Sequence, residues 1–287
     1  MVLMIPLSKN EIHLSLCDYD EVTDEEMHNV YRALLSDQEK QQETRFYFEK
    51  DRRRYLLTRA LVRTALSRFE PIPPRDWIFS VNAYGRPEVA NTGVGDVRPS
   101  FNISHTNSLI VLGVTKSRAL GLDVENVCAR KVSIDIADRF FSPNEIAALA
   151  VVPPSRQQDR FFEYWTFKEA YIKARGMGLS IPLDKFSFQY PDEGAVQISI
   201  HPELADDAER WQFWQFRPTP EYLVAVCAER VEIGLPAIEV RKTVPMGVEE
   251  RIAPVFTRTS GKAGGATAQM LGGSVDVQRR YEREPWG

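Results

Sequence analysis

Two rounds of helical pattern, each accompanied by short β-type runs, make up most of this chain, and this order constrains its fold more than any other feature. The first round starts at a T-x-x-E capping pattern, Thr23 to Glu26, and continues into a long helix predicted over 37–68. The second starts at Ser142 and continues into a helix that Gly176 ends. The β-type runs lie at 77–81, 101–104, 108–115 and 119–125, and then at 185–189, 196–200, 211–216 and 222–228. The pattern predicts an α+β protein with two similar halves, the last four runs forming an antiparallel meander.

The two rounds also define the expected domains. We predict an N-terminal half over residues 1–115 and a C-terminal half over residues 116–233. Beyond about residue 234 the character changes, and the stretch TSGKAGGATAQMLGGS is rich in small residues and has little periodicity. Such a composition cannot bury enough apolar surface to fold. Residues 234–287 are therefore predicted to form a disordered tail.

Charge and cysteine content exclude several protein classes. The formal net charge is −4, so no overall basic field indicates a nucleic-acid partner. Cys17, Cys128 and Cys227 are far apart and form no CxxC pair, which argues against a disulfide framework or a zinc site and favours a reducing compartment. The N-terminal residues lack a signal-peptide pattern, and no segment approaches the length of a membrane span. A cytoplasmic protein without a membrane partner is expected.

Three carboxylates are notable for their places on the predicted elements. Asp123 and Glu125 are two residues apart on a strand, so their side chains project from one face and repel each other. Two solvated acids on an exposed strand are the simpler interpretation of that pair. Glu169 lies at helical spacing from Phe162 and Trp165, on a largely apolar face where an unpartnered carboxylate is costly.

Two arrangements would satisfy Glu169. Lys173, one helical turn further along, could form a structural ion pair with it. A cation shared with Asp123 and Glu125 would satisfy all three acids, and carboxylates without nearby His or Cys suit Mg²⁺ rather than zinc. Because protein Mg²⁺ sites leave positions for substrate phosphates, the lysines beside these acids favour phosphate chemistry.

Two further candidates carry little weight by themselves. His105 follows a predicted strand in FNISHTN, and a lone histidine in a turn is more often structural. The basic run Arg52, Arg53 and Arg54 lies on a predicted helix, where a solvated face is the default interpretation.

Taken together, these segments resemble the Sfp-type 4′-phosphopantetheinyl transferases. That family carries a G-x-D-x-E strand and a W-x-x-K-E-x-x-x-K helix followed by G-x-G-L. Here the two blocks are GLDVENV, from Gly121, and WTFKEAYIKARGMGL, from Trp165 to Leu179. YGRP at 84–87, FNISHT at 101–106 and RRRYLLTRALVR in the long helix are also similar. The combination of the two blocks is more specific than either block alone.

The resemblance implies a reaction and a fold. Coenzyme A would donate its 4′-phosphopantetheine arm to a serine of an apo acyl or peptidyl carrier protein, with Mg²⁺ as the cofactor and 3′,5′-ADP as the leaving product. The implied fold is a pseudo-dimer of two α+β halves with the donor in the cleft between them. The length of the chain favours the monomeric branch of the family.

The resemblance also implies a role for each matching residue. Asp123, Glu125 and Glu169 would hold Mg²⁺, and Glu169 would accept the serine proton, with a metal-bound water as the competing base. Lys173 would contact a phosphate of the donor and stabilise the leaving group. The other implied contacts to coenzyme A are Arg54, Tyr84, Gly85, Arg86, Pro87, Ser104, His105 and Lys168.

Two details stay open at this stage. Relatives use lysines just before the long helix to bind the 3′-phosphate, whereas this chain has Gln41, Gln42 and Glu43 there. Glu145 matches an acid in the F-S-x-x-E motif of the family, but a helix-capping role explains it equally well.

Two other functions fit parts of the pattern. A catalytically silent relative would bind coenzyme A or carrier proteins without turnover, although every metal and lysine position is filled. A Mg²⁺-dependent nucleotide phosphodiesterase would hydrolyse coenzyme A without an acceptor, although no dedicated water-activating pair is evident. Carriers of fatty acid, polyketide and nonribosomal peptide systems all fit the transferase interpretation.

Overall fold

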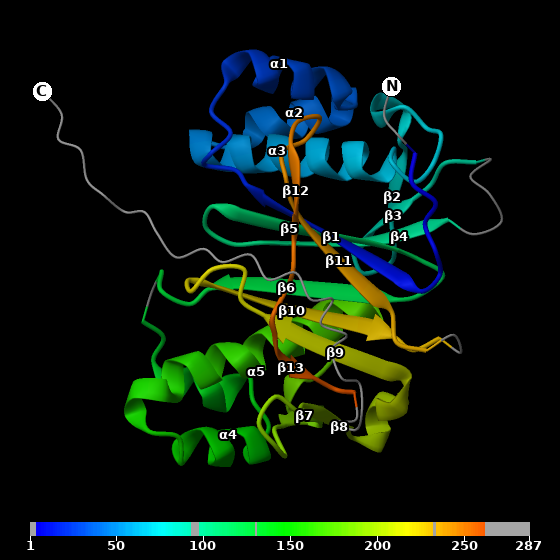
Figure 1. Ribbon diagram of the computed structural model, residues 1–287. Helices are drawn as coiled ribbons and strands as arrows, with labels where there is room; N and C mark the ends of the chain where they lie inside the picture. The colour runs from blue at the N-terminus through cyan, green and yellow to red at the C-terminus, as the bar shows by residue number, and fades with distance from the viewer. Residues whose placement is uncertain (1–3, 93–97, 130, 232–233, 262–287) are drawn as a thin grey trace, which may run out of the picture.

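The computed structural model describes residues 4–92, 98–129, 131–231 and 234–261 of the chain. Two β-sheets lie at the centre, one group of helices packs outside the first sheet, and a second group packs outside the other sheet (Figure 1). Within these ranges, no helix is both long and apolar enough to cross a membrane.

The first sheet has five strands in the order β12-β11-β1-β5-β4, and helices α1 to α3 lie over it (Figure 1). A small hairpin, β2-β3, connects the helices to β4. The elements of this half are β1 (Glu11–Asp18), α1 (Glu25–Leu34), α2 (Asp37–Arg45), α3 (Glu49–Leu66), β2 (Phe79–Val81), β3 (Pro87–Val89), β4 (Pro99–His105) and β5 (Leu109–Lys116), joined by β11 (Ala237–Thr243) and β12 (Glu249–Ile252) from the end of the chain.

The second sheet has four strands in the order β13-β9-β10-β6, with α4 and α5 on its outer side (Figure 1). Its elements are β6 (Leu120–Asn126), α4 (Pro143–Ala150), α5 (Pro154–Arg175), β7 (Phe186–Gln189), β8 (Gln197–Ile200), β9 (Trp211–Phe216), β10 (Tyr222–Glu229) and β13 (Phe256–Thr259). Short 3₁₀ helices lie at Pro74–Asp76, Ile134–Arg139, Gly178–Ser180, Leu183–Lys185, Pro202–Leu204 and Ala208–Arg210.

The two halves repeat one topology. In the first, β1 pairs with β5 and β5 pairs with β4, all antiparallel. In the second, β6 pairs with β10 and β10 pairs with β9, again antiparallel. Helices follow the first strand of each half, and a separate two-stranded hairpin, β2-β3 or β7-β8, precedes the last two strands. The predicted α+β pseudo-dimer is confirmed. Strand β5 ends at Lys116 and β6 begins at Leu120, beside the expected domain boundary.

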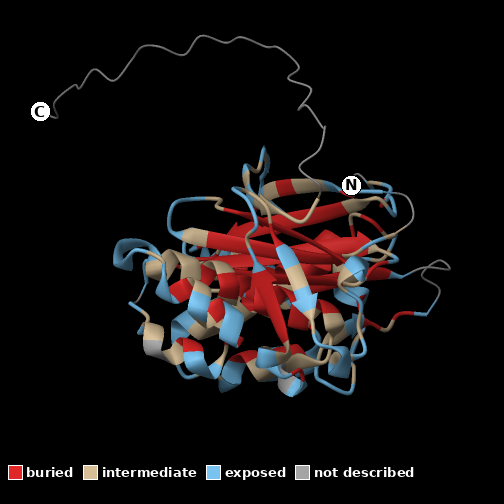
Figure 2. Ribbon diagram, turned by 90° about the horizontal axis from the view of Figure 1, so that it is seen from below, coloured by how far each residue is buried: buried red, intermediate tan, exposed pale blue. Residues whose placement is uncertain are grey.

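Three apolar clusters hold these layers together. One lies between the first sheet and α1 to α3, and another lies between the second sheet and α4 and α5. The third joins the two sheets face to face, and Leu14, Val111, Leu122 and Val226 are buried in it. Figure 2 accordingly shows strands that are mostly buried, while the helices expose their outer faces. The two halves therefore share one core and hold their functional residues in fixed relation.

The end of the described chain corrects the predicted tail. Residues 237–243 form β11, which pairs in parallel with β1, and residues 256–259 form β13 at the edge of the second sheet. A disordered tail starting at residue 234 is therefore wrong as far as residue 261, because the side chain of Val240 is buried between the sheets. Residues 262–287 lie outside the described ranges.

Local differences from the prediction have simple causes. The long helix expected over 37–68 is two helices, because α2 ends at Arg45 and a new helix starts at Glu49. The first helix is capped by the Asp24 carboxylate, which accepts the amides of Glu26 and Met27, rather than by Thr23. The expected four-strand meander is also wrong, because β7 and β8 form their own two-stranded sheet. Strand β1 was not predicted.

Candidate active site

Helix α5 and strand β6 carry the three predicted metal ligands, and the two elements pack against each other at very close range. Gly121 permits this contact, because a Cβ atom there would lie 2.0 Å from the Ala170 carbonyl oxygen and 2.3 Å from the Ala174 amide nitrogen. These are backbone atoms of a helix, which cannot turn aside as a side chain can. The glycine of the G-x-D-x-E motif therefore sets the distance between Asp123 on the strand and Glu169 on the helix.

Asp123 is buried at the centre of this contact. Its Oδ1 atom lies 2.6 Å from the Lys173 ammonium and accepts a hydrogen bond of 3.0 Å from the Ser104 hydroxyl. The same hydroxyl accepts a 3.0 Å hydrogen bond from Lys173. The other oxygen, Oδ2, is buried and has no hydrogen-bond partner within the described part of the chain. An unpartnered buried carboxylate oxygen is costly, so Asp123 Oδ2 is an atom of this site that a ligand would stabilise.

Glu169 is partly buried on the same side of α5 as Lys173. Burial raises the pKa of the Glu169 carboxyl, and the nearby negative charge of Asp123 raises it further, while Lys173 acts in the opposite direction. Repulsion by the Asp123 carboxylate is thus the second cause of the raised pKa, after burial. A carboxyl with a raised pKa is a better proton acceptor than an ordinary glutamate.

Glu125 has a different partner. Its Oε1 atom accepts a 3.1 Å hydrogen bond from the indole nitrogen of Trp165, whose ring packs against Phe140 and Phe161. Among the residues that the structure describes, no group of three His, Cys, Asp or Glu side chains is arranged to hold a metal ion. The three acids therefore do not converge on one point in this side-chain arrangement. Asp123 and Glu169 are the two whose carboxylates repel each other.

Basic groups from the N-terminal half complete the site. His105, at the end of β4, is exposed, and its pKa is lowered by partial desolvation and then by the positive charges of Arg54 and Lys173. Arg54 lies on α3 and forms a 2.9 Å ion pair with Asp51. The fold thus brings positive side chains from α3 and α5 close to the imidazole on β4. A site of this kind attracts a polyanion.

Comparison with known proteins identifies the family. A model of the 4′-phosphopantetheinyl transferase superfamily matches residues 119–227, and a model of the 4′-phosphopantetheinyl transferase N-terminal domain matches residues 22–117. A 4′-phosphopantetheinyl transferase of Bacillus subtilis is 38% identical over 196 residues, which cover 68% of this chain and 83% of that protein. The chain belongs to the 4′-phosphopantetheinyl transferase family. The transferase Sfp of Bacillus subtilis strain 168 is 33% identical over 73% of this chain and 88% of its own length. The transferase gsp of Aneurinibacillus migulanus is 34% identical over 62% and 70%, respectively.

In this transferase, Lys168 is not placed to contact coenzyme A, which corrects the prediction. Its side chain is fully buried, and its ammonium lies 2.8 Å from the Glu145 carboxylate, the Leu183 carbonyl and the Phe186 carbonyl. All three ammonium protons therefore have acceptors. Glu145 is also fully buried: it closes the capping box of α4 with Ser142 and accepts the Phe188 amide. Its role in the structure is to hold α4, α5 and β7 together.

Arg86 of the transferase also has structural partners. Its Nη1 atom donates to the carbonyls of Lys173 and Ala174, at 2.7 and 3.3 Å, and so satisfies carbonyls at the end of α5. Its Nη2 atom donates to the carbonyls of Phe101 and Leu120, at 3.4 and 3.0 Å. Its four Nη protons are thus committed to the backbone, and the contact of this guanidinium with the donor stays a prediction.

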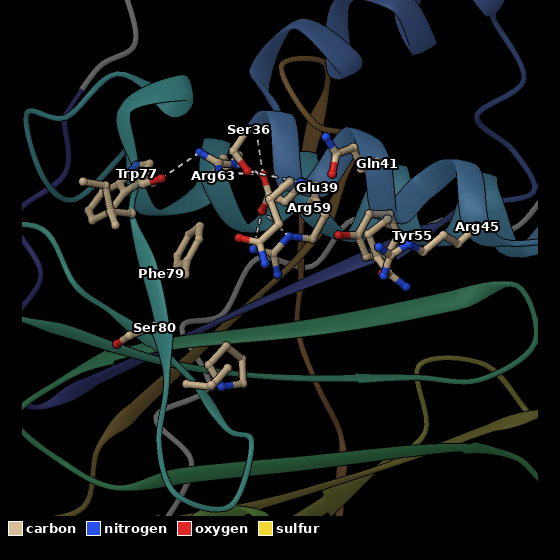
Figure 3. A pocket seen from close by; sticks show the side chains of 15 residues that line it. Ser36, Glu39, Gln41, Arg45, Tyr55, Arg59, Arg63, Trp77, Phe79 and Ser80 are labelled. Atoms are coloured by element: carbon tan, nitrogen blue, oxygen red, sulfur yellow. Dashed lines mark hydrogen bonds and ion pairs between the residues drawn. The ribbon is translucent and has the colours of Figure 1, made fainter.

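The rest of the YGRP segment remains accessible. Tyr84 is exposed, and Gly85 has a left-handed φ of +84° in the turn between β2 and β3. Pro87 and the strand β2 line a pocket of about 740 Å³ under α2 and α3 (Figure 3). Gln41, Gln42 and Arg45 line the same pocket.

A buried ion cluster in this pocket was missed by the sequence reasoning. Glu39 accepts hydrogen bonds of 2.6 Å from Arg59 and 2.6 Å from Arg63 (Figure 3). Burial acts to raise the pKa of Glu39, but the arginine charges and the Ser36 amide outweigh it, and the pKa is lowered. The spacing of Arg59 and Arg63, four residues apart on one helix face, was the available signal. Only the fold shows that Glu39 faces both.

Proposed function

We propose that this enzyme transfers the 4′-phosphopantetheine arm of coenzyme A to a serine of an apo carrier protein, using Mg²⁺ and releasing 3′,5′-ADP. Family membership supports the reaction. The observation that carries the site is the buried Asp123 Oδ2 atom, which has no partner among the described residues and lies beside the coupled Glu169 carboxyl.

The residues present fit a Mg²⁺ ion. The donor set consists of carboxylates, which Mg²⁺ prefers, and a cation would satisfy Asp123 Oδ2 and relieve the repulsion between Asp123 and Glu169. Asp123 and Glu169 would hold the ion, with Glu125 as the third predicted ligand if it leaves Trp165. When bound, the ion supplies positive charge that stabilises the leaving phosphate.

The chain contributes binding and proton transfer. Lys173 and Arg54 supply positive charge for the donor phosphates, His105 supplies an imidazole beside them, and Lys173 also supplies charge to the leaving group. We assign Glu169 to accept the serine proton, either directly or through a metal-bound water. We assign the pocket beside Pro87 to the nucleotide end of coenzyme A. Tyr84 and Gly85, three and two residues before Pro87, stay predicted contacts of the same group.

We further propose that the enzyme works as a monomer in the cytoplasm, without a nucleic-acid or membrane partner. The three cysteines are free thiols, which suits a reducing compartment. The inter-sheet core lies within one chain, so the two halves already pair as two subunits would.

The test is the mass of apo carrier proteins after incubation with enzyme, coenzyme A and Mg²⁺. A panel from fatty acid, polyketide and nonribosomal peptide systems identifies the acceptor class. We expect one phosphopantetheine per carrier, and a loss of about 10²–10³-fold in rate for Asp123→Asn and Glu169→Gln. Asp159→Asn, near the start of α5 and 3.1 Å from the Arg217 guanidinium, is the matched control and should keep full activity.

Two results would contradict the proposal. Hydrolysis of coenzyme A without any acceptor would identify a phosphodiesterase. Binding of coenzyme A and carrier without any mass gain across the panel would identify a silent relative.

A further inference from the structure

Strand β6, which carries Asp123 and Glu125, is the edge strand of the second sheet. It pairs on one side with β10 in an antiparallel ladder. In such a ladder, the amides of alternate residues point to the partner strand, and the other set points away from it. The outward amides of β6 face the first half, where β4 is likewise the edge strand of its sheet. Unpaired edges are unstable unless something covers them.

Side chains from β4 and the residue after it cover this edge in a regular series. The Asn102 Oδ1 atom accepts the Leu122 amide at 2.8 Å, and the Ser104 hydroxyl accepts the Val124 amide at 3.3 Å. The Thr106 hydroxyl accepts the Asn126 amide at 3.3 Å. Each donor lies 20 residues after its acceptor, so the two strands run in parallel and in register. Asn102, Ser104 and Thr106 are called the side-chain ladder below.

The ladder replaces backbone pairing between the halves. Its three members alternate along the chain, as residues on one face of a strand do. Because side-chain oxygens take the place of backbone carbonyls, the spacing between the strands is set by side-chain length. Asn102 and Ser104 are buried, and removing either oxygen would leave a buried amide without its acceptor. The ladder therefore holds β6 at one position against β4.

The ladder amides alternate with the carboxylates of the active site. Asp123 lies between the Leu122 and Val124 amides, and Glu125 lies between those of Val124 and Asn126. The middle member also touches the site directly, since the Ser104 hydroxyl donates to Asp123. His105 lies between the Ser104 and Thr106 acceptors on the opposite side.

We propose that the side-chain ladder is a positioning device that fixes the carboxylates on β6 relative to His105 and Arg54 of the first half. The proposal rests on the proposed function, because those groups are assigned to the metal and the donor phosphates. Thr106 and Asn102 are positioning residues, because they act through β6. The role predicts that shifting β6 by a fraction of an ångström lowers turnover more than it lowers stability.

The outermost member gives the cleanest test. Thr106→Val removes the hydroxyl with little change of shape, and Thr106→Ser keeps it. Thr115→Val is the matched control, because this buried hydroxyl donates a 3.0 Å hydrogen bond to the Glu11 carbonyl within the first sheet rather than to β6. For each variant we would measure amide exchange at Asn126 by NMR, the Tm, and kcat and KM for coenzyme A.

In Thr106→Val we expect Asn126 exchange to accelerate by about tenfold. We also expect kcat to fall by about tenfold with a smaller change in KM. Thr106→Ser should restore the Asn126 exchange rate and kcat to their wild-type values. Thr115→Val should lower Tm at least as much as Thr106→Val does, while its kcat stays at the wild-type value.

The proposal is overturned if Asn126 in Thr106→Val exchanges at the wild-type rate, if kcat in Thr106→Val stays at the wild-type value, or if Thr115→Val lowers kcat by as much as Thr106→Val does. If the wild-type enzyme modifies no carrier, the proposed function fails by itself. The exchange rates would still report whether the ladder holds β6.

Discussion

Replacing Gly121 with alanine should separate the two elements that build the active site. The added Cβ would lie 2.0 Å from the Ala170 carbonyl oxygen, whereas ordinary contacts start at 3.4 Å, so α5 must move away by about 1.4 Å. Such a forced expansion of a packed core costs about 1–3 kcal/mol in the free energy of unfolding. The same shift carries Lys173 out of hydrogen-bond range of Asp123.

The assay combines urea unfolding with transfer kinetics. For Gly121→Ala we expect a free energy of unfolding lower by about 1–3 kcal/mol. We expect kcat lower by about 10²-fold, because a 1 Å misplacement in an active site has that order of effect. Gly113→Ala is the control, because the three atoms nearest to its Cβ are side-chain tips of Leu120 and Leu122, both at 2.8 Å, and of Leu14 at 3.2 Å, and side-chain tips can rotate. Wild-type stability and kcat in Gly121→Ala would refute the packing argument.

Two other perturbations separate structural from functional groups. Lys168→Met leaves the buried Glu145 carboxylate without its ammonium partner, so it should lower the free energy of unfolding by about 3–5 kcal/mol. The KM for coenzyme A of the folded enzyme should stay unchanged. A rise in KM without the loss of stability would show that Lys168 does contact coenzyme A. Glu169 binds its proton more tightly in the folded state than in the unfolded state, so without Mg²⁺ its contribution to stability falls as pH rises from about 4.5 through its raised pKa. Glu169→Gln should therefore be more stable than the wild type at pH 7 and should lose that advantage at pH 4 in urea titrations; equal stability at both pH values would contradict the pKa shift.

Much of the site could be predicted from the sequence, because its residues lie in short motifs whose spacing matches a known family. The fold brings Asp123, Ser104 and Lys173 into direct contact, and it places Glu169 next to Asp123. Lys168 could not be placed in the same way. Helical spacing tells which residues share a face, but it does not tell that Glu145, on another helix, faces Lys168.

The remaining misses also have physical causes. Strand β1 is buried along six consecutive residues, yet its sequence alternates, with Ile12, Leu14 and Leu16 separated by His13 and Ser15. The signal for this strand was therefore present in the sequence and was missed. The predicted disordered tail was started too early, at residue 234, because the Gly-rich composition that follows Thr259 was applied to the residues before it. Ile238 and Val240 alternate with polar residues, as in a strand. The side-chain ladder depends on two strand edges that meet only in the folded molecule, so no sequence pattern predicts it.

We propose above all that the carboxylates of Asp123 and Glu169 bind one divalent ion, which also contacts the diphosphate of coenzyme A. A crystal of the enzyme with coenzyme A and Mn²⁺, which replaces Mg²⁺ and scatters anomalously, tests it directly. We predict an anomalous peak at about 2.1–2.2 Å from Asp123 Oδ2, within reach of Glu169 and of the diphosphate oxygens. A peak elsewhere, or coenzyme A bound with Asp123 still paired only to Lys173 and Ser104, would contradict the account.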